Sequence, residues 1–369
     1  MHTPAGLMCR GTAELTASIR GAGLTYGELV RRVAHEYRDS ARRLVEAEGT
    51  GALAFSVGRE MRQLSSHRIW LRGRTVPSAA ERAAGKAPAL VRFRSDSVAY
   101  SVLWDDEGVP NGLSFDTRPG DAGKRAAYAK ASDRQGDRQY EVGTDDDTRR
   151  WEQGAPQGID RANTRTVSAP WFDPDLPGRP TLIGGHADPS KFHIDAREAY
   201  TMDGDPVGRQ ELTVDGWTLG THLITNPDFW VIHTAQGSGH VVYHSVCSPG
   251  GVTETGLRSN YNNGVYGDPG EWGPVRHNGT TLDASAAVLH RHGVDAPVHG
   301  ANGETVATAH HPDGRPDGRP VRGSDSGFEW NPVPDRSSIV VIPDKDAAGN
   351  SVEGAFRTVH PPSATGADA

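Results

Sequence analysis

One segment of this chain limits its possible folds more than any other. Residues 239–247 form a run rich in valine and other apolar side chains, and the run leads directly into Ser248, Pro249 and two glycines. A short apolar run that ends in turn residues is typical of a buried β-strand. We therefore predict a strand here that lies in the core of the fold.

Strands and helices alternate along the sequence from about residue 176 onward. Residues 202–208 carry turn residues between two short apolar segments, which predicts a β-hairpin. Such alternation indicates an α/β fold with a largely parallel sheet flanked by helices. The other expected strands are 181–186, 296–299 and 338–342, and the expected helices are 217–229 and 282–292.

The N-terminal part of the chain has a different pattern. Apolar residues recur at every third or fourth position over 24–64, and the pattern is interrupted by a Gly-Thr-Gly sequence at 49–51. This spacing predicts two amphipathic helices. We therefore expect residues 1–88 to form a helical N-terminal region that serves for packing or interaction.

The middle of the chain joins this region to the α/β part. Alternating patterns at 89–94 and 98–104 predict a β-hairpin that opens a segment spanning 89–175. This hairpin either joins the core sheet or lies beside it. The remainder of the segment is charged and short of large apolar side chains, which predicts a solvated helix and a long linker. We place the α/β domain at 176–345 and a disordered tail at 346–369.

Composition argues against several classes of protein. The chain has 39 Lys and Arg against 47 Asp and Glu, without a basic block, so we predict no nucleic-acid partner. No stretch approaches the ~18 apolar residues of a spanning helix, so we predict no membrane partner. The N-terminus lacks the basic and apolar regions of a signal peptide, and the two cysteines lie in dissimilar contexts. We expect a cytoplasmic protein, or one exported by a signal-independent route.

Two of the predicted strands end near residues that can carry chemistry, His186 and Cys247. In open α/β sheets the functional crevice lies at the carboxyl ends of the strands, so both side chains should project into the same edge. A thiol is the most readily activated nucleophile among side chains, and an imidazole can protonate a leaving amine near neutral pH. The pair therefore predicts nucleophilic acyl transfer.

Neighbouring residues suggest how a substrate would be held. Gly185 would let a substrate backbone approach closely, and the backbone N–H groups of Ala187 and Ser248 would face a developing oxyanion. His244 would share the crevice with Cys247, since both follow the same predicted strand. Asp188 would orient the imidazole or bind a basic substrate side chain, unless it is only a solvated loop carboxylate.

One further acidic residue and the histidines also need an interpretation. Asp215 is a second acidic residue that would orient the imidazole or remain a solvated loop carboxylate. The chain has 16 histidines, and none of them has Cys, Asp or Glu partners at a recognisable metal-ligand spacing. We therefore predict no metal and no cofactor.

The order of these features resembles that of the caspase-like cysteine peptidases, and within them the "lonely Cys" domains of very large bacterial proteins. The matching text is LIGGH at 182–186, VDGWTL at 214–219, VVYHSVC at 241–247 and DAPVHG at 295–300. The resemblance covers about 176–345 and implies a caspase-like sheet. It also implies that His186 is the catalytic imidazole and Cys247 the nucleophile. The chain departs from the family pattern at Ala187, where the family has glycine.

Three hypotheses of function follow. The first is a cysteine endopeptidase that forms an acyl-enzyme and cleaves a protein or peptide, including a loop of its own chain. The second is an inactive caspase-like module that binds proteins through its N-terminal helices. The third is a toxin or effector fragment with other transfer chemistry, such as acyl or ADP-ribosyl transfer. Fast alkylation of Cys247 by iodoacetamide would separate the first hypothesis from the second.

Overall fold

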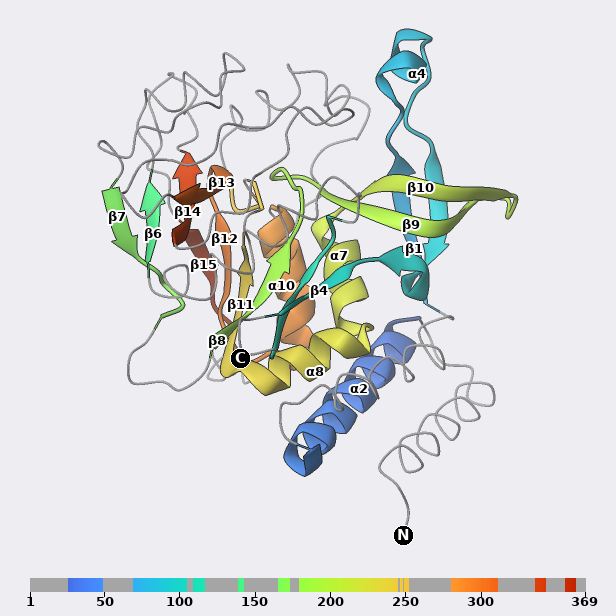
Figure 1. The fold of residues 1–369 in the computed structure, drawn as a ribbon. Coiled ribbons are helices and arrows are strands. Elements are labelled where there is room, and N and C mark those ends of the chain that lie inside the picture. The colour runs from blue at the N-terminus through green and yellow to red at the C-terminus, as the bar shows by residue number, and fades with distance from the viewer. Residues whose placement is uncertain are drawn as a thin grey trace, which may run out of the picture.

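The structure is a computed structural model that describes residues 26–48, 69–104, 109–116, 139–142, 165–172, 179–244, 246–247, 249–251, 280–310, 336–342 and 356–362. These residues form three β-sheets with helices packed around them (Figure 1). We call them the central sheet, the hairpin sheet and the outer sheet. The predicted mixed α/β fold is therefore confirmed. Among the described residues, no helix combines the length and the apolar character needed to cross a lipid bilayer.

The central sheet contains six strands in the order β15-β12-β11-β8-β5-β4. Its middle strands, β5, β8, β11 and β12, run parallel to one another, whereas the edge strands β4 and β15 are antiparallel to their neighbours. This arrangement confirms the parallel sheet expected from the alternation of strands with helices. The strands are β4 Ser101–Trp104, β5 Pro110–Ser114, β8 Arg179–Gly184, β11 Gly237–Tyr243, β12 Val298–Ala301 and β15 Phe356–Val359.

The two faces of the central sheet are covered differently. Val241 and Tyr243 of β11 pack with the helices, while Val242 between them packs with the outer sheet. All three side chains are fully buried, because a strand covered on both faces has no solvent-exposed side. We predicted a sheet flanked by helices, and in the described part the helices lie on one face while β-strands cover the other. The helices are α2 Tyr26–Glu48, α7 Gly216–Ile224, α8 Pro227–Gln236 and α10 Thr281–Arg291.

The hairpin sheet joins the N-terminal region to the α/β part. β9 and β10 form the expected hairpin, and β1 and β2 form a second hairpin with the short helix α4 at its tip (Figure 1). β1 also pairs with β10, so the prediction of a wholly helical region before residue 89 was wrong. The elements are β1 Trp70–Thr75, α4 Ala79–Ala83, β2 Leu90–Arg94, the short 3-10 helix Ser95–Ser97, β3 Val98–Ala99, β9 Phe192–Thr201 and β10 Pro206–Val214.

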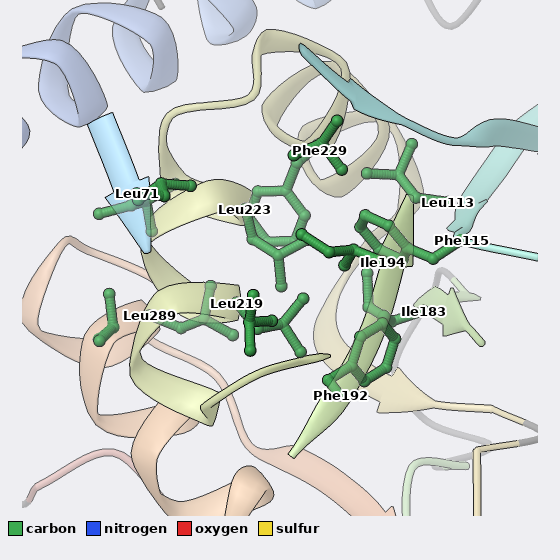
Figure 2. Packing of buried hydrophobic residues seen from close by; sticks show 14 of the residues in the cluster. Leu71, Leu113, Phe115, Ile183, Phe192, Ile194, Leu219, Leu223, Phe229 and Leu289 are labelled. Carbon is green, nitrogen blue, oxygen red and sulfur yellow. The ribbon is translucent and has the colours of Figure 1, made fainter. Parts of the chain in front are cut away.

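One hydrophobic cluster contains residues of the hairpin sheet, of the central sheet and of the four helices α2, α7, α8 and α10. It crosses the boundaries that we placed at 88/89 and 175/176, so the three predicted segments share a core. The strands predicted at 89–94 and 98–104 do not form a hairpin with each other, because β2 pairs with β1 and β9 in the hairpin sheet, whereas β4 pairs with β5 in the central sheet. Burial of this apolar surface supplies most of the favourable free energy of folding, at about 25 cal/mol per Å². Figure 2 shows part of the cluster, including Leu71, Phe115, Ile183, Phe192, Leu219, Leu223 and Phe229.

The outer sheet and β15 correct two further predictions. β6 lies where we expected a helix and linker, and β15 lies where we expected a disordered tail. The Phe356 ring packs 4.7 Å from Trp171 and 5.0 Å from Tyr140, measured between centroids. Partners so far apart in the chain leave no local apolar pattern in any one segment. The outer strands are β6 Gln139–Val142, β7 Arg165–Ser168, β13 Glu304–His310 and β14 Arg336–Ile342.

Local patterns predicted three of the described helices. α2, α7 and α10 occupy segments with the predicted helical spacing, whereas most of α8 lies beyond residue 229, where we predicted no helix. Each of α7, α8 and α10 begins at a side-chain cap. The single helix predicted at 217–229 is interrupted at Asn226, whose side chain caps α8. The second helix expected within 24–64 lies outside the described residues.

Candidate functional site

Three chemistry-bearing residues follow the carboxyl ends of three adjacent parallel strands. Asp116 lies two residues beyond β5, His186 two residues beyond β8, and Cys247 four residues beyond β11. β8 pairs with β5 on one side and with β11 on the other. The loops after these strands therefore start from the same edge of the central sheet, which is where open α/β sheets hold their ligands.

His186 pairs with a buried carboxylate. Its Nε2 atom lies 3.2 Å from Oδ1 of Asp116, whose side chain is only 2% exposed, whereas the His186 side chain is 45% exposed. A buried carboxylate at this distance orients the ring and favours the tautomer or charge state with a proton on Nε2. His186 therefore presents an oriented imidazole at the surface of the sheet edge.

Sequence patterns did not lead us to Asp116; we considered Asp188 and Asp215 as partners for the imidazole, with solvated loop carboxylates as the alternative. The carboxylate of Asp188 accepts hydrogen bonds from the backbone of Ser190 at 2.7 Å and of Lys191 at 2.9 Å, so it closes its own turn. Asp215 caps α7 by accepting from the backbone of Thr218 at 2.7 Å. A usable signal was present, because Asp116 follows a strand pattern at 113–115 as His186 follows β8.

The loop after β8 is built by its own residues. Asp188 is buried and also accepts from the Ser190 hydroxyl at 2.7 Å, and its Oδ2 lies 3.6 Å from Nζ of buried Lys191. Burial lowers the pKa of Lys191, and the Asp188 carboxylate partly opposes this effect. A Cβ on Gly185 would lie 2.6 Å from the Phe192 ring, so glycine is required there by packing. Ala187 is buried and forms a β-bridge with Phe192.

Cys247 lies in a loop rather than at a strand end. We predicted that the strand would continue to residue 247, but β11 ends at Tyr243. The thiol is partly exposed and donates to the backbone carbonyl of Thr305 in β13, with a separation of 3.7 Å between Sγ and the oxygen. The Thr305 hydroxyl lies 4.0 Å from Sγ. Ser248, which we expected to contribute an oxyanion contact, lies outside the described residues.

The first turn of α10 holds both loops. The backbone N–H of Thr281 donates to the carbonyl of Pro189 at 2.6 Å, in the loop after His186. The next N–H, of Leu282, donates to the carbonyl of Pro249 at 2.8 Å, in the loop after Cys247. Two consecutive residues of one helix thus bind the two loops that carry the predicted dyad, which brings these loops together.

His244 is a core side chain in this structure. It is 1% exposed, and its backbone N–H donates to the carbonyl of Ile183 at 2.9 Å. Burial lowers its pKa to about 3, so its imidazole is neutral at physiological pH. The prediction that it lines a crevice beside Cys247 therefore has no support from its position.

Other histidines also have structural partners. His290 and His292 each donate a ring N–H to a backbone carbonyl, that of Ala296 and that of Val288. His240 stacks on His299, with 2.8 Å between their nearest ring nitrogens. Within the described ranges, no group of three or more His, Cys, Asp or Glu side chains is arranged to hold a metal ion.

Comparisons with known proteins identify no relative of this chain. A scan against protein-family models, a search of curated proteins and a search of solved structures each returned no match. Function must therefore be inferred from the geometry of Asp116, His186 and Cys247.

Proposed function

We propose that this chain is a caspase-like cysteine endopeptidase in which Cys247 is the nucleophile and His186 the general acid and base. The observation that carries the proposal is the 3.2 Å contact between Nε2 of exposed His186 and the buried carboxylate of Asp116, at the sheet edge whose next loop holds the partly exposed residue Cys247. An oriented imidazole beside an accessible cysteine is the combination that thiol acyl transfer requires. Asp116 extends the predicted dyad with a residue that positions the imidazole.

The proposed reaction needs no cofactor. The thiolate of Cys247 attacks the carbonyl carbon of the scissile peptide bond and forms a tetrahedral intermediate, whose oxyanion accepts hydrogen bonds from nearby backbone N–H groups. Nδ1 of His186 protonates the departing amine as the carbon–nitrogen bond breaks, which leaves a thioester. Neutral His186 then takes a proton from water, and the resulting hydroxide attacks the thioester, which releases the carboxylic acid and regenerates the thiolate. The buried carboxylate of Asp116 stabilises the imidazolium that is present before the amine departs and again after the water is deprotonated.

Two features of the structure support a common site for the two residues. The loops that carry His186 and Cys247 bind adjacent N–H groups of α10, so their relative position depends on this helix. Neither residue is fully buried, because the His186 side chain is 45% exposed and Cys247 has intermediate exposure. A histidine and a cysteine that only stabilised the fold would gain no stability from exposure to solvent.

The experiment that tests the proposal measures peptide cleavage by the full chain. A mixture of proteome-derived peptides is incubated with the wild-type protein, Cys247→Ala and His186→Ala, and new termini are detected by mass spectrometry. We expect both variants to lose cleavage by on the order of 10³-fold or more, since nucleophile and base act as a unit. Cys9→Ala is the matched control, because it removes the other thiol, and it should cleave like the wild type.

The two alternative hypotheses are distinguished by the same protein samples. Cleavage that persists in Cys247→Ala would sink the peptidase proposal. No cleavage together with slow iodoacetamide alkylation of Cys247 would favour a protein-binding module. Transfer of an acyl or ADP-ribosyl group to a protein acceptor would favour the effector hypothesis.

A further inference from the structure

The last described strand of the chain contacts the loop that carries Cys247. Nη1 of Arg357, in β15, donates to the backbone carbonyl of Gly250 with a separation of 3.3 Å. Gly250 lies three residues after Cys247 in the sequence. Its own N–H donates to the carbonyl of Ala301 in β12 at 3.0 Å. Both backbone polar groups of Gly250 are therefore held by strands at the edge of the central sheet.

The same guanidinium also binds the helix that supports both loops. Arg357 forms an ion pair with Asp283, in the first turn of α10. The Asp283 carboxylate accepts hydrogen bonds from the backbone N–H of Thr280 at 2.9 Å and from its hydroxyl at 3.0 Å, which completes the cap of the helix. One arginine thus connects the loop after Cys247 to the turn that binds the loop after His186.

The environment of this arginine is tight. The Arg357 and Asp283 side chains are 27% and 25% exposed, and partial burial lowers the pKa of the guanidinium below its ordinary value, which still leaves it charged at neutral pH. A Cβ on Gly250 would lie 3.0 Å from the carbonyl oxygen of Gly300, so the loop packs closely on β12. Because the loop at Gly250 packs closely on β12, a displacement of the Arg357 guanidinium would also displace the loop.

We propose that Arg357 is a positioning residue for Cys247, acting through Gly250 and Asp283. This inference rests on the proposed function, because it assigns β15 the task of holding the nucleophile at the correct distance from His186. The region that we predicted to be a disordered tail is then required for reactivity of the thiol. A displacement of about 1 Å at a reacting group can lower a rate on the order of 100-fold, so a single ion pair can suffice.

The test uses the full chain in a Cys9→Ala background, so that Cys247 is the only thiol. The iodoacetamide alkylation rate of Cys247 is measured against pH for the parent, Arg357→Gln, Arg357→Lys, Asp283→Asn and the Arg357→Gln/Asp283→Asn double variant. We expect Arg357→Gln to move the rise of the alkylation rate to higher pH and to lower kcat for peptide cleavage about 10- to 100-fold. Arg357→Lys should restore part of the alkylation profile and part of kcat. The double variant should resemble Arg357→Gln and Asp283→Asn, because all three break the same ion pair.

Arg209→Gln is the matched control. Arg209 forms a similar pair with Asp195 through its Nε at 3.1 Å and 3.0 Å, but on the hairpin formed by β9 and β10. It should leave the alkylation profile unchanged. Thermal unfolding is recorded for every variant, and reactivity is compared at a temperature where all of them are folded.

The outcomes separate this inference from the proposed function. An Arg357→Gln profile that matches the parent, while His186→Ala shifts it, would overturn the positioning role and leave the peptidase proposal standing. Should His186→Ala also match the parent, the proposed dyad itself fails. If Arg357→Gln does not fold, Asp283→Asn carries the test, since its amide oxygen can still accept from Thr280.

Discussion

The two loops that carry the candidate dyad are built in different ways. The loop after His186 is held mainly by its own neighbours, since Asp188 binds Ser190 and Lys191 within three residues, and its contacts with α10 come from one residue, Thr281. The loop after Cys247 is held by groups 33 to 107 residues further along the chain, in α10, β12, β13 and β15. A locally built loop tolerates changes elsewhere, whereas the cysteine loop depends on distant elements. The geometry of the site is therefore most sensitive at Cys247.

Acid should destabilise the whole molecule more than any single substitution. Burial lowers the pKa of His233 to about 4 and that of His244 to about 3, from an ordinary value of 6.5. Between about pH 6.5 and pH 4 these two histidines bind protons in the unfolded state but remain neutral in the folded state. The free energy of unfolding therefore falls as the pH falls over this range. We expect the free energy of unfolding, measured in urea, to fall by several kcal/mol over this range.

His233 lies in α8, and His244 lies directly after β11. Loss of cleavage on acidification should therefore accompany unfolding and should be reversed at neutral pH. His35→Gln is the control, because His35 is 64% exposed and pairs only at the surface with Asp39. A free energy of unfolding that stays constant between pH 6.5 and 4 would contradict this prediction.

Asp116→Asn should give the largest loss of activity among substitutions outside the dyad. The amide cannot stabilise the imidazolium of His186 and favours the wrong tautomer, so we expect kcat to fall by about 10²- to 10⁴-fold. The measurement is peptide cleavage at saturating substrate, with circular dichroism to confirm the fold. Asp215→Asn is the control, since that residue only caps α7. Equal losses in both variants would show that Asp116 acts by stability alone.

Asp188→Ala breaks the locally built loop. It removes a buried carboxylate and leaves the buried ammonium of Lys191 without this partner, which costs about 3 kcal/mol or more. Chemical denaturation should detect this loss, whereas the pH dependence of Cys247 alkylation should change little in the protein that remains folded. A changed alkylation profile at full stability would mean that the two loops are not independent.

The smallest effects should come from two glycines, and they compare the loops directly. A Cβ at Gly185 meets Phe192 at 2.6 Å, and one at Gly250 meets the Gly300 oxygen at 3.0 Å. Each alanine substitution should cost about 1–3 kcal/mol of stability, as overpacking usually does. Only Gly250→Ala should also alter alkylation of Cys247. The comparison of the loops would be wrong if Gly185→Ala altered it equally.

Local patterns predicted the elements that need only nearby residues. The apolar runs at β8 and β11, the turn residues between β9 and β10, and the helical spacing of α10 each appear within a short window of sequence. His186 was found in the same way, because it follows such a run. Its placement beside Asp116 could not be predicted, since that contact joins loops 70 residues apart.

The amino-acid order alone thus specified an α/β fold with a histidine and a cysteine beyond two of its strands. Period and turn chemistry are properties of a few consecutive residues, so they can be recognised without the rest of the chain. Tertiary structure decided that helices cover one face of the central sheet, that β15 completes its edge, and that Asp116 and Arg357 contact the candidate site. These features arise when distant segments bury a common surface, and no local pattern encodes such a pairing.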